Sequence, residues 1–173
     1  MSKTGAIPQY RTAIGQDSHR FVEGSEAADR ILLLAGVPIS GTPPLAGNSD
    51  ADVVLHAVTN AVSGITGVNV LGKIADRMCL EERITDSSAY LAEALLHLGA
   101  FRVVHLSVSI EAKRPHLAPY VEAMRQKLAR LLSLELSEVG LTVTSGEELT
   151  DFGRGLGIQV LCILTAWRPS SEE

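Results

Sequence analysis

Apolar and polar residues alternate along several stretches of this chain, which is the pattern of half-buried β-strands. Residues 10–15 open the chain in this way, with Tyr10, Thr12 and Ile14 on one side. The other predicted strands span residues 101–110, 139–144 and 157–167. "RILLLAGVPI" adds a hairpin, because two short apolar runs flank Ala35 and Gly36.

Apolar residues at a period of 3.6 predict three helices. The first begins at residue 49 or 50, the second spans residues 87–98, and the third spans residues 119–134. Asp86 and Gly99 flank the second helix as cap residues. Residues 69–84 have no clean period and predict a loop with room for a short helix. This order of elements predicts an α+β fold, with a single mixed sheet and helices packed on one face.

Composition narrows the class of protein. The 173 residues, of which 46% are apolar, are enough for one domain with a real core, and we expect flexible tails at residues 1–9 and 169–173. A net charge of −5 argues against a protein that binds nucleic acid through bulk positive charge. No apolar run approaches the roughly 18 residues of a membrane span, and no secretory signal pattern opens the chain, so we expect a cytoplasmic location.

Asp17 and His19 stand two residues apart in "IGQDSHRF", directly after the first strand pattern. If this stretch is extended, the two side chains point to the same face. His56 lies in "SDADVVLHA", at the edge of the apolar stripe of the first helix. One carboxylate and two imidazoles, with an open fourth position, form the ligand pattern of a catalytic zinc site. The alternative is that His56 is a partly buried histidine of the core.

A second polar cluster lies in "TVTSGEELTDFGRGLG", at the end of a predicted strand. The hydroxyls of Thr144 and Ser145 and the N–H groups of a glycine turn suit phosphate oxygens, and the carboxylate of Glu147 suits Mg²⁺. The alternative is a plain hairpin loop.

Five segments in register give the chain a resemblance that no single segment would carry. "GQDSHRF", "NSDADVVLHA", "ITDSS", "AKRPHLAP" and "TSGEELTDFGRGLG" resemble, in order and spacing, the motifs of the 2-C-methyl-D-erythritol 2,4-cyclodiphosphate synthase family. The resemblance runs from about residue 12 to residue 165. It implies a homotrimer whose active sites lie between subunits.

The resemblance also implies a role for each matching residue. Asp17, His19 and His56 would bind one Zn²⁺, and Glu147 would bind Mg²⁺ or Mn²⁺ together with substrate phosphates. Ser49, Thr144 and Ser145 would hold phosphates, and Gly72 and Asp86 would contact substrate. The cytosine pocket would be formed by Ala112, Lys113, Arg114, Pro115 and Leu117. Arg154 would face the trimer axis, where it could hold an anion.

The implied reaction is that of a phosphorus–oxygen lyase acting on a small cytidine diphosphate substrate. Within 4-diphosphocytidyl-2-C-methyl-D-erythritol 2-phosphate, the 2-phosphate attacks the β-phosphorus, closes the ring and expels CMP. Four places depart from the family pattern. Asn48 replaces a usual histidine, and Val70 replaces an aspartate that usually contacts the erythritol hydroxyls. "IADR" replaces a usual "F-P-D", and Asp151-Phe152 alters the middle of the last loop. We therefore expect weaker binding of the erythritol end. The alternatives are an altered substrate, or a non-catalytic trimer that binds phosphorylated isoprenoids or nucleotides.

Overall fold

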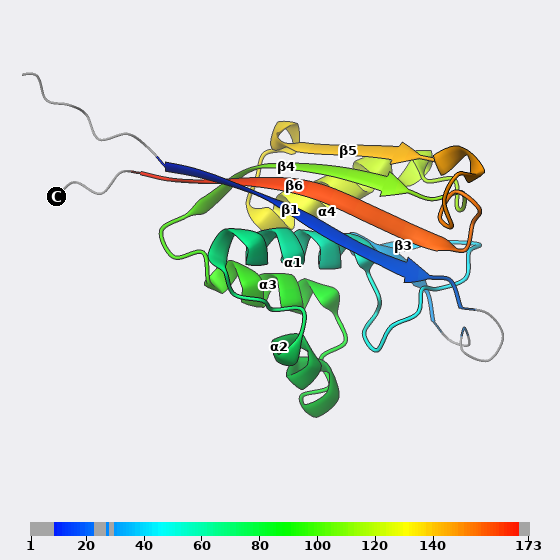
Figure 1. The fold of residues 1–173 in the computed structure, drawn as a ribbon, viewed down its shortest axis with the longest axis horizontal. Coiled ribbons are helices and arrows are strands. Elements are labelled where there is room, and N and C mark those ends of the chain that lie inside the picture. The colour runs from blue at the N-terminus through cyan, green and yellow to red at the C-terminus, as the bar shows by residue number, and fades with distance from the viewer. Residues whose placement is uncertain (1–8, 23–26, 28–29, 170–173) are drawn as a thin grey trace, which may run out of the picture.

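The computed structural model describes residues 9–22, 27 and 30–169, and its centre is a four-stranded sheet with the order β1-β6-β4-β5 (Figure 1). These strands are β1 (Gln9–Arg20), β4 (Arg102–Glu111), β5 (Val139–Thr144) and β6 (Gly157–Arg168). β6 pairs antiparallel with β1 and β4, whereas β4 and β5 run parallel. The sheet is therefore mixed, as the sequence predicts.

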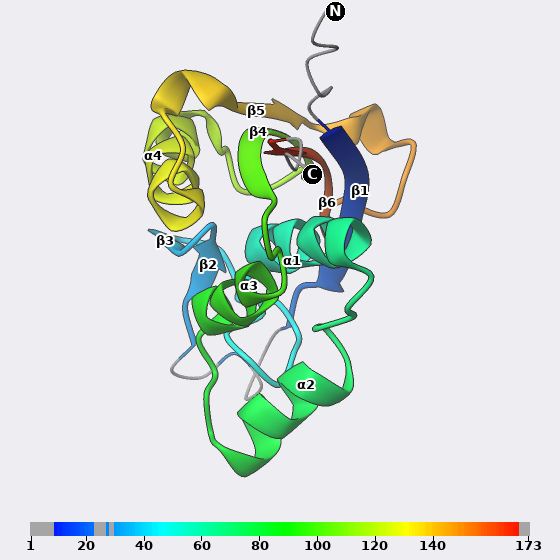
Figure 2. The ribbon, with the colours of Figure 1, turned by 90° about the vertical axis from the view of Figure 1, so that its left-hand side faces the viewer.

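The helices lie on one side of this sheet, as Figures 1 and 2 show. They are α1 (Val53–Thr66), α2 (Lys73–Asp76), α3 (Ser87–Leu96) and α4 (Val121–Leu132), and a π-helical turn, η2 (Arg77–Glu81), continues α2. α1 packs against β1 and β6, and α4 packs against β5. Within the described ranges, no helix has the length and apolar character needed to cross a membrane.

The prediction of a single sheet is wrong. β2 (Leu32–Leu34) and β3 (Val37–Ile39) form a separate two-stranded sheet. Ala35 and Gly36 both have positive φ angles, 53° and 71°, which is the backbone of a tight two-residue turn. The hairpin itself is therefore confirmed, but its strands are too short to extend the main sheet.

Most boundaries lie within two residues of the predicted ones, and two lie further away. β1 continues through Asp17 and His19 to Arg20, because every residue from Gln9 to Arg20 has a pairing partner in β6. Gln9 thus belongs to a strand, while the rest of the predicted N-terminal tail, and the C-terminal tail beyond Pro169, lie outside the described residues. α1 begins at Val53 rather than at residue 49 or 50, with Asp52 as its N-cap.

The core lies between the helices and one face of the sheet. Alternate residues of β6 point into it and are buried: Ile158, Val160, Cys162, Leu164 and Ala166. The opposite face of the sheet carries no helix within the described chain, and Ile14 and Ile163 there are 67% and 49% exposed. The thiol of Cys162 is buried in this core, and its burial raises its pKa to about 12.

Candidate metal centre and cleft

A close approach between β1 and α1 positions the candidate metal centre. Gly15 is buried in β1, and a Cβ atom there would collide with the carbonyl oxygen of Ala57 in α1. Only glycine therefore lets the strand lie this close to the helix. Two and four residues further along β1, Asp17 and His19 point to the same side and meet His56 from the first turn of α1.

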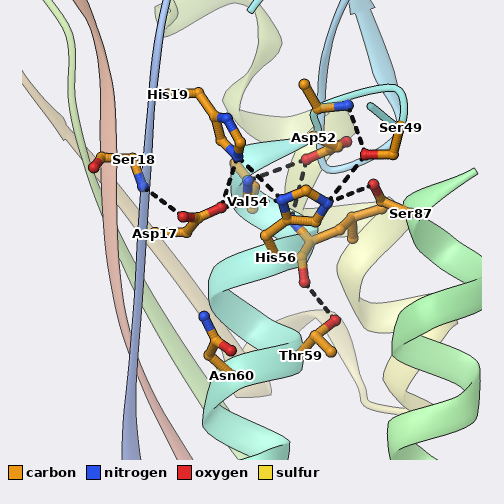
Figure 3. Close-up of polar contacts among 12 residues, drawn as sticks. Asp17, Ser18, His19, Ser49, Asp52, Val54, His56, Thr59, Asn60 and Ser87 are labelled. Carbon is orange, nitrogen blue, oxygen red and sulfur yellow. Dashed lines mark hydrogen bonds and ion pairs between the residues drawn. The ribbon is translucent and has the colours of Figure 1, made fainter. Parts of the chain in front are cut away.

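Three ligand atoms converge at this point (Figure 3). Asp17 Oδ2 lies 2.9 Å from His19 Nε2 and 3.0 Å from His56 Nδ1. The two imidazole nitrogens are 3.2 Å apart. His56 is 9% exposed, so the centre is mostly shielded from bulk water on the α1 side. The sequence prediction that these three residues come together is confirmed.

The spacing of these atoms fits a metal ion. In a tetrahedral zinc site with bonds near 2.0–2.1 Å, neighbouring ligand atoms lie about 3.3 Å apart. The three separations here, 2.9, 3.0 and 3.2 Å, are only slightly shorter. The other ring nitrogen of His19 completes the fit, because Nδ1–H donates to the carbonyl oxygen of Ala46 at 2.6 Å and so leaves the Nε2 lone pair for the centre.

Electrostatics favour an anionic ligand at Asp17. Burial raises the pKa of this carboxyl, but the hydrogen bonds and positive charge of His19 and His56 outweigh burial and hold the pKa well below its usual value. For His19, burial lowers the pKa, and the contacts with Asp17 outweigh burial and raise it. In the described chain, these residues are the one group of three acids, histidines or cysteines whose ligand atoms converge.

The centre opens into a cleft of about 370 Å³. Ser49 and Gly72, both expected to contact substrate, line this cleft together with Asn48. Asp76, a carboxylate near Gly72 in the sequence, also lines the cleft. The other lining residues carried no signal in the sequence: Asn60, Leu71, Ala75, Cys79 and Tyr90. Cys79 donates from its thiol to the backbone carbonyl of Asn48 at 3.4 Å, so the π-helical turn and the 47–50 loop form one rim of the cleft.

The expected base-binding and phosphate-binding residues form a second group at the ends of β4 and β5. Lys113 N–H donates to the carbonyl of Phe152 at 3.1 Å, and Arg114 Nε donates to Gly155 at 3.2 Å. These bonds hold Ala112, Lys113, Arg114, Pro115 and Leu117 against the 145–156 loop. Glu147 is exposed in a left-handed backbone conformation, and its carboxylate accepts from the Ser145 hydroxyl at 2.8 Å.

The two groups do not meet within one chain. Four residues form one row across the sheet, from β5 to β1: Thr144 pairs with Glu111, Glu111 with Gln159, and Gln159 with Ser18. Thr144 and Asp17 are therefore separated by three strand spacings, about 14 Å. Their side chains also point to opposite faces of the sheet. Thr144 shares a face with Ser18, because both lie in the same row, and Ser18 points away from its neighbour Asp17.

Two further candidates have other partners in the structure. Asp86 is exposed and caps α3 by accepting from Ser88 N–H at 2.8 Å; it lines a separate hollow beside Lys127 rather than the cleft. Arg154 donates to Asp151 at 2.8 Å and to the carbonyl of Glu148 at 3.3 Å. Its guanidinium is thus already held by its own loop, although 54% of the side chain is exposed.

Comparison with known proteins agrees with this architecture. The model of the YgbB family matches residues 10–167. The 2-C-methyl-D-erythritol 2,4-cyclodiphosphate synthase of Chlamydia caviae is 46% identical over 157 residues, which are 90% of this chain and 88% of that protein.

Two solved structures extend the comparison. A CDP-bound structure of a 2-C-methyl-D-erythritol 2,4-cyclodiphosphate synthase is 28% identical and has a TM-score of 0.78. The match covers 90% of this chain and 99% of the chain in that structure. The bifunctional IspDF from Campylobacter jejuni, also 28% identical, has a TM-score of 0.83 over 95% of this chain and 44% of that longer protein. On this family match and these relatives, the chain belongs to the YgbB family, together with the cyclodiphosphate synthases that it resembles.

Proposed function

We propose that this chain converts 4-diphosphocytidyl-2-C-methyl-D-erythritol 2-phosphate into 2-C-methyl-D-erythritol 2,4-cyclodiphosphate and CMP, a step of non-mevalonate isoprenoid biosynthesis. The observation that carries the proposal is the convergence of Asp17, His19 and His56 at the cleft of a chain of this family. An oxygen of the 2-phosphate bonds to the β-phosphorus. The bond from that phosphorus to the bridging oxygen breaks, and the oxygen leaves with CMP, which makes the enzyme a phosphorus–oxygen lyase.

The proposed cofactors are Zn²⁺, held by Asp17, His19 and His56, and Mg²⁺ or Mn²⁺, held by Glu147 and the substrate phosphates. These cations would supply the positive charge that offsets repulsion between the attacking phosphate and the diphosphate. Ser49 lines the cleft beside the centre, which suits its proposed role in holding a phosphate. Thr144 and Ser145 are exposed beside Glu147 and suit the same role at the other end of the substrate.

The chain needs a second copy to complete the site, and we propose the homotrimer on this ground. The metal centre lies on the helix side of β1, whereas Thr144 lies three strands away on the open side. A substrate held at both ends must therefore bridge two chains. Ala112 to Leu117 of one subunit would hold the cytosine, and the cleft of its neighbour would hold the erythritol phosphate.

The test is CMP release from the cytidine substrate by the purified chain, with Glu147→Gln and His56→Ala beside the wild type. We expect turnover by the wild type and a loss of at least about a hundredfold in each variant, because each removes charge stabilisation from the reaction. Glu148→Gln is the matched control, since Glu148 is also exposed in this loop but pairs with Lys113 at 2.9 Å.

The same experiment decides between the proposal and its alternatives. A folded wild-type chain that binds the substrate without releasing CMP supports a non-catalytic binding protein. Loss of zinc from His56→Ala by elemental analysis, with an unchanged melting temperature for Glu147→Gln, shows that the two residues serve metals rather than the fold.

A further inference from the structure

The outward nitrogen of His56 has a partner that the metal centre does not account for. His56 Nε2 lies 2.9 Å from the hydroxyl oxygen of Ser87, the first residue of α3 (Figure 3). The Ser49 hydroxyl is further away, at 3.5 Å. Ser87 has no exposed surface, so no water competes for this contact. A residue of α3 therefore holds the imidazole that α1 presents to the centre.

The single hydrogen of the Ser87 hydroxyl is directed away from His56. Ser87 Oγ makes a short hydrogen bond to Asp50 Oδ1, and Ser87 N–H donates to Asp50 Oδ2 at 3.0 Å. The N–H of Asp52 also donates to Asp50 Oδ1, at 3.1 Å. A carboxylate that receives three donors can only accept. The Ser87 hydrogen is thus committed to Asp50, and the Ser87 oxygen is left to accept from His56.

From this chain of hydrogen bonds, we propose that Asp50 and Ser87 are positioning residues that fix the tautomer and orientation of His56 for metal binding. Because Ser87 can only accept, His56 carries its hydrogen on Nε2, and the lone pair of Nδ1 points at Asp17 and His19. Asp50 thereby controls a metal ligand that it does not touch. The inference rests on the proposed function in one respect, that the centre binds a divalent metal.

The two histidines of the centre are held by different means. The Nδ1–H of His19 donates to the backbone carbonyl of Ala46, which no side-chain substitution removes. His56 depends on two side chains from two other segments. Asp50 N–H also donates to the carbonyl of Thr85 at 2.9 Å, so the same residue ties the entrance of α1 to the segment before α3. The His56 half of the centre is therefore the half that substitutions outside the ligand set can weaken.

The experiment measures Zn²⁺ and Co²⁺ affinity of the metal-free protein by competition with a chromogenic chelator. We expect Ser87→Ala and Asp50→Asn each to weaken binding about 10- to 100-fold, the usual effect of removing the outer partner of a metal-bound histidine. Ser88→Ala is the matched control: it makes the same change one residue along α3, at a hydroxyl with no hydrogen bond within the described chain, and its affinity should equal that of the wild type.

The double variant separates a relay from two independent effects. If Asp50 acts through Ser87, Asp50→Asn lowers the metal affinity much less in the Ser87→Ala background than in the wild type. Nitrogen-15 shifts of the metal-free protein at alkaline pH give a second readout, because they report which nitrogen of His56 carries the hydrogen. We expect Nε2–H in the wild type and a mixture in Ser87→Ala, a change that a purely structural role would not produce.

Each result has a definite consequence. Wild-type affinity in both single variants, or additive losses in the double variant, overturns the positioning role while leaving the proposed function intact. A wild-type chain that binds neither ion overturns the metal centre and the positioning role together. Should Ser87→Ala not fold, Asp50→Asn decides alone, because Asp50 is only half-buried and its amide replacement keeps the shape.

Discussion

The side chain of Val70 has no exposed surface and packs in the apolar core, whereas its neighbours Leu71 and Gly72 line the cleft. Its backbone is also fixed, because the Val70 carbonyl accepts from the N–H groups of Gly72 and Ala75, at 2.9 and 3.0 Å. The Val70 side chain therefore does not reach the cleft, and the expected weaker binding of the erythritol end stays a prediction. The cleft residues Leu71, Gly72 and Asp76 are the ones able to contact that part of a substrate.

This placement gives Val70→Asp a clear outcome. A carboxylate at a fully buried apolar position has no partner, so we expect the free energy of unfolding to fall by roughly 3 kcal/mol or more, measured by chemical denaturation. Asn69→Asp is the control, because Asn69 is exposed and the same charge there should cost little. A Val70→Asp protein with unchanged stability and a lower KM would contradict this, and would show that residue 70 contacts the erythritol end of the substrate.

At the scale of elements, the start of α1 shows what periodicity cannot resolve. Ser49 and Asp50 are good N-cap residues, but each uses its side chain on the residue two positions ahead, at Ala51 N–H and Asp52 N–H. Ala51 then has a positive φ of 56°, which prevents a helix from passing through it. The sequence offers three acceptable caps in four residues, and only tertiary contacts select Asp52.

Asp52 is selected because it serves two elements at once. Its buried carboxylate accepts from Val54 and Leu55 in α1, at 3.1 and 3.0 Å, and from the N–H groups of Ala35 and Gly36 in the hairpin turn. Burial nevertheless raises its pKa, with these N–H donors opposing that rise. The residue joins the separate β2–β3 sheet to the helix that carries His56.

We expect the two aspartate caps to differ in their effect on stability. Asp52→Ala leaves four N–H groups without their acceptor, two from each element, and should cost about 2 kcal/mol or more of unfolding free energy. Asp86→Ala removes one bond of an exposed cap and should cost about 0.5–1 kcal/mol. Denaturation curves of the two variants test this order. Equal losses would contradict it, and a raised KM in Asp86→Ala would support its predicted contact with substrate.

The same elements show which parts of the fold the sequence pattern predicts and which it misses. The 3.6-residue stripe of α1 and the alternation in β4, β5 and β6 come from burial on one side, so sequence alone predicted them. The predicted β1 ended five residues too early, leaving out Gln16 to Arg20, because the core-facing positions at this end hold Gly15, Asp17 and His19 instead of apolar residues. The alternation of apolar and polar residues therefore breaks down where site residues occupy core-facing positions of the strand. Cleft residues such as Tyr90 and Cys79 gave no signal, since only the fold brings them to the rim.

The whole molecule has an open sheet face with apolar side chains at its centre. Ile14 and Ile163 are cross-strand partners on this face, and Leu161, at 39% exposure, lies on the same face of β6. Together with a site divided between two distant groups of residues, this surface supports packing against another copy of the chain. Assembly would then both cover the face and complete the cleft.

Subunit complementation tests this arrangement directly. His56→Ala removes the metal half of a site, and Glu147→Gln removes the loop half. If each site takes its halves from different chains, mixed trimers contain some sites with both halves intact. With equal amounts and random exchange, about one site in four is restored, since each half is intact with a chance of about one half. We expect CMP release to rise from near zero to about a quarter of the wild-type rate after unfolding and refolding the two proteins together.

The control for complementation is a mixture in which both variants damage the same half. His56→Ala refolded with His19→Ala leaves every site with a defective metal half, so its activity should stay near zero, while light scattering still reports trimers. Restored activity in the first mixture alone requires a site between chains, because neither variant chain has both halves intact. A site between chains agrees with the opposite sheet faces on which Asp17 and Thr144 of one chain lie. Absence of recovery in well-formed mixed trimers would place both halves in a single chain and would contradict the register of the sheet.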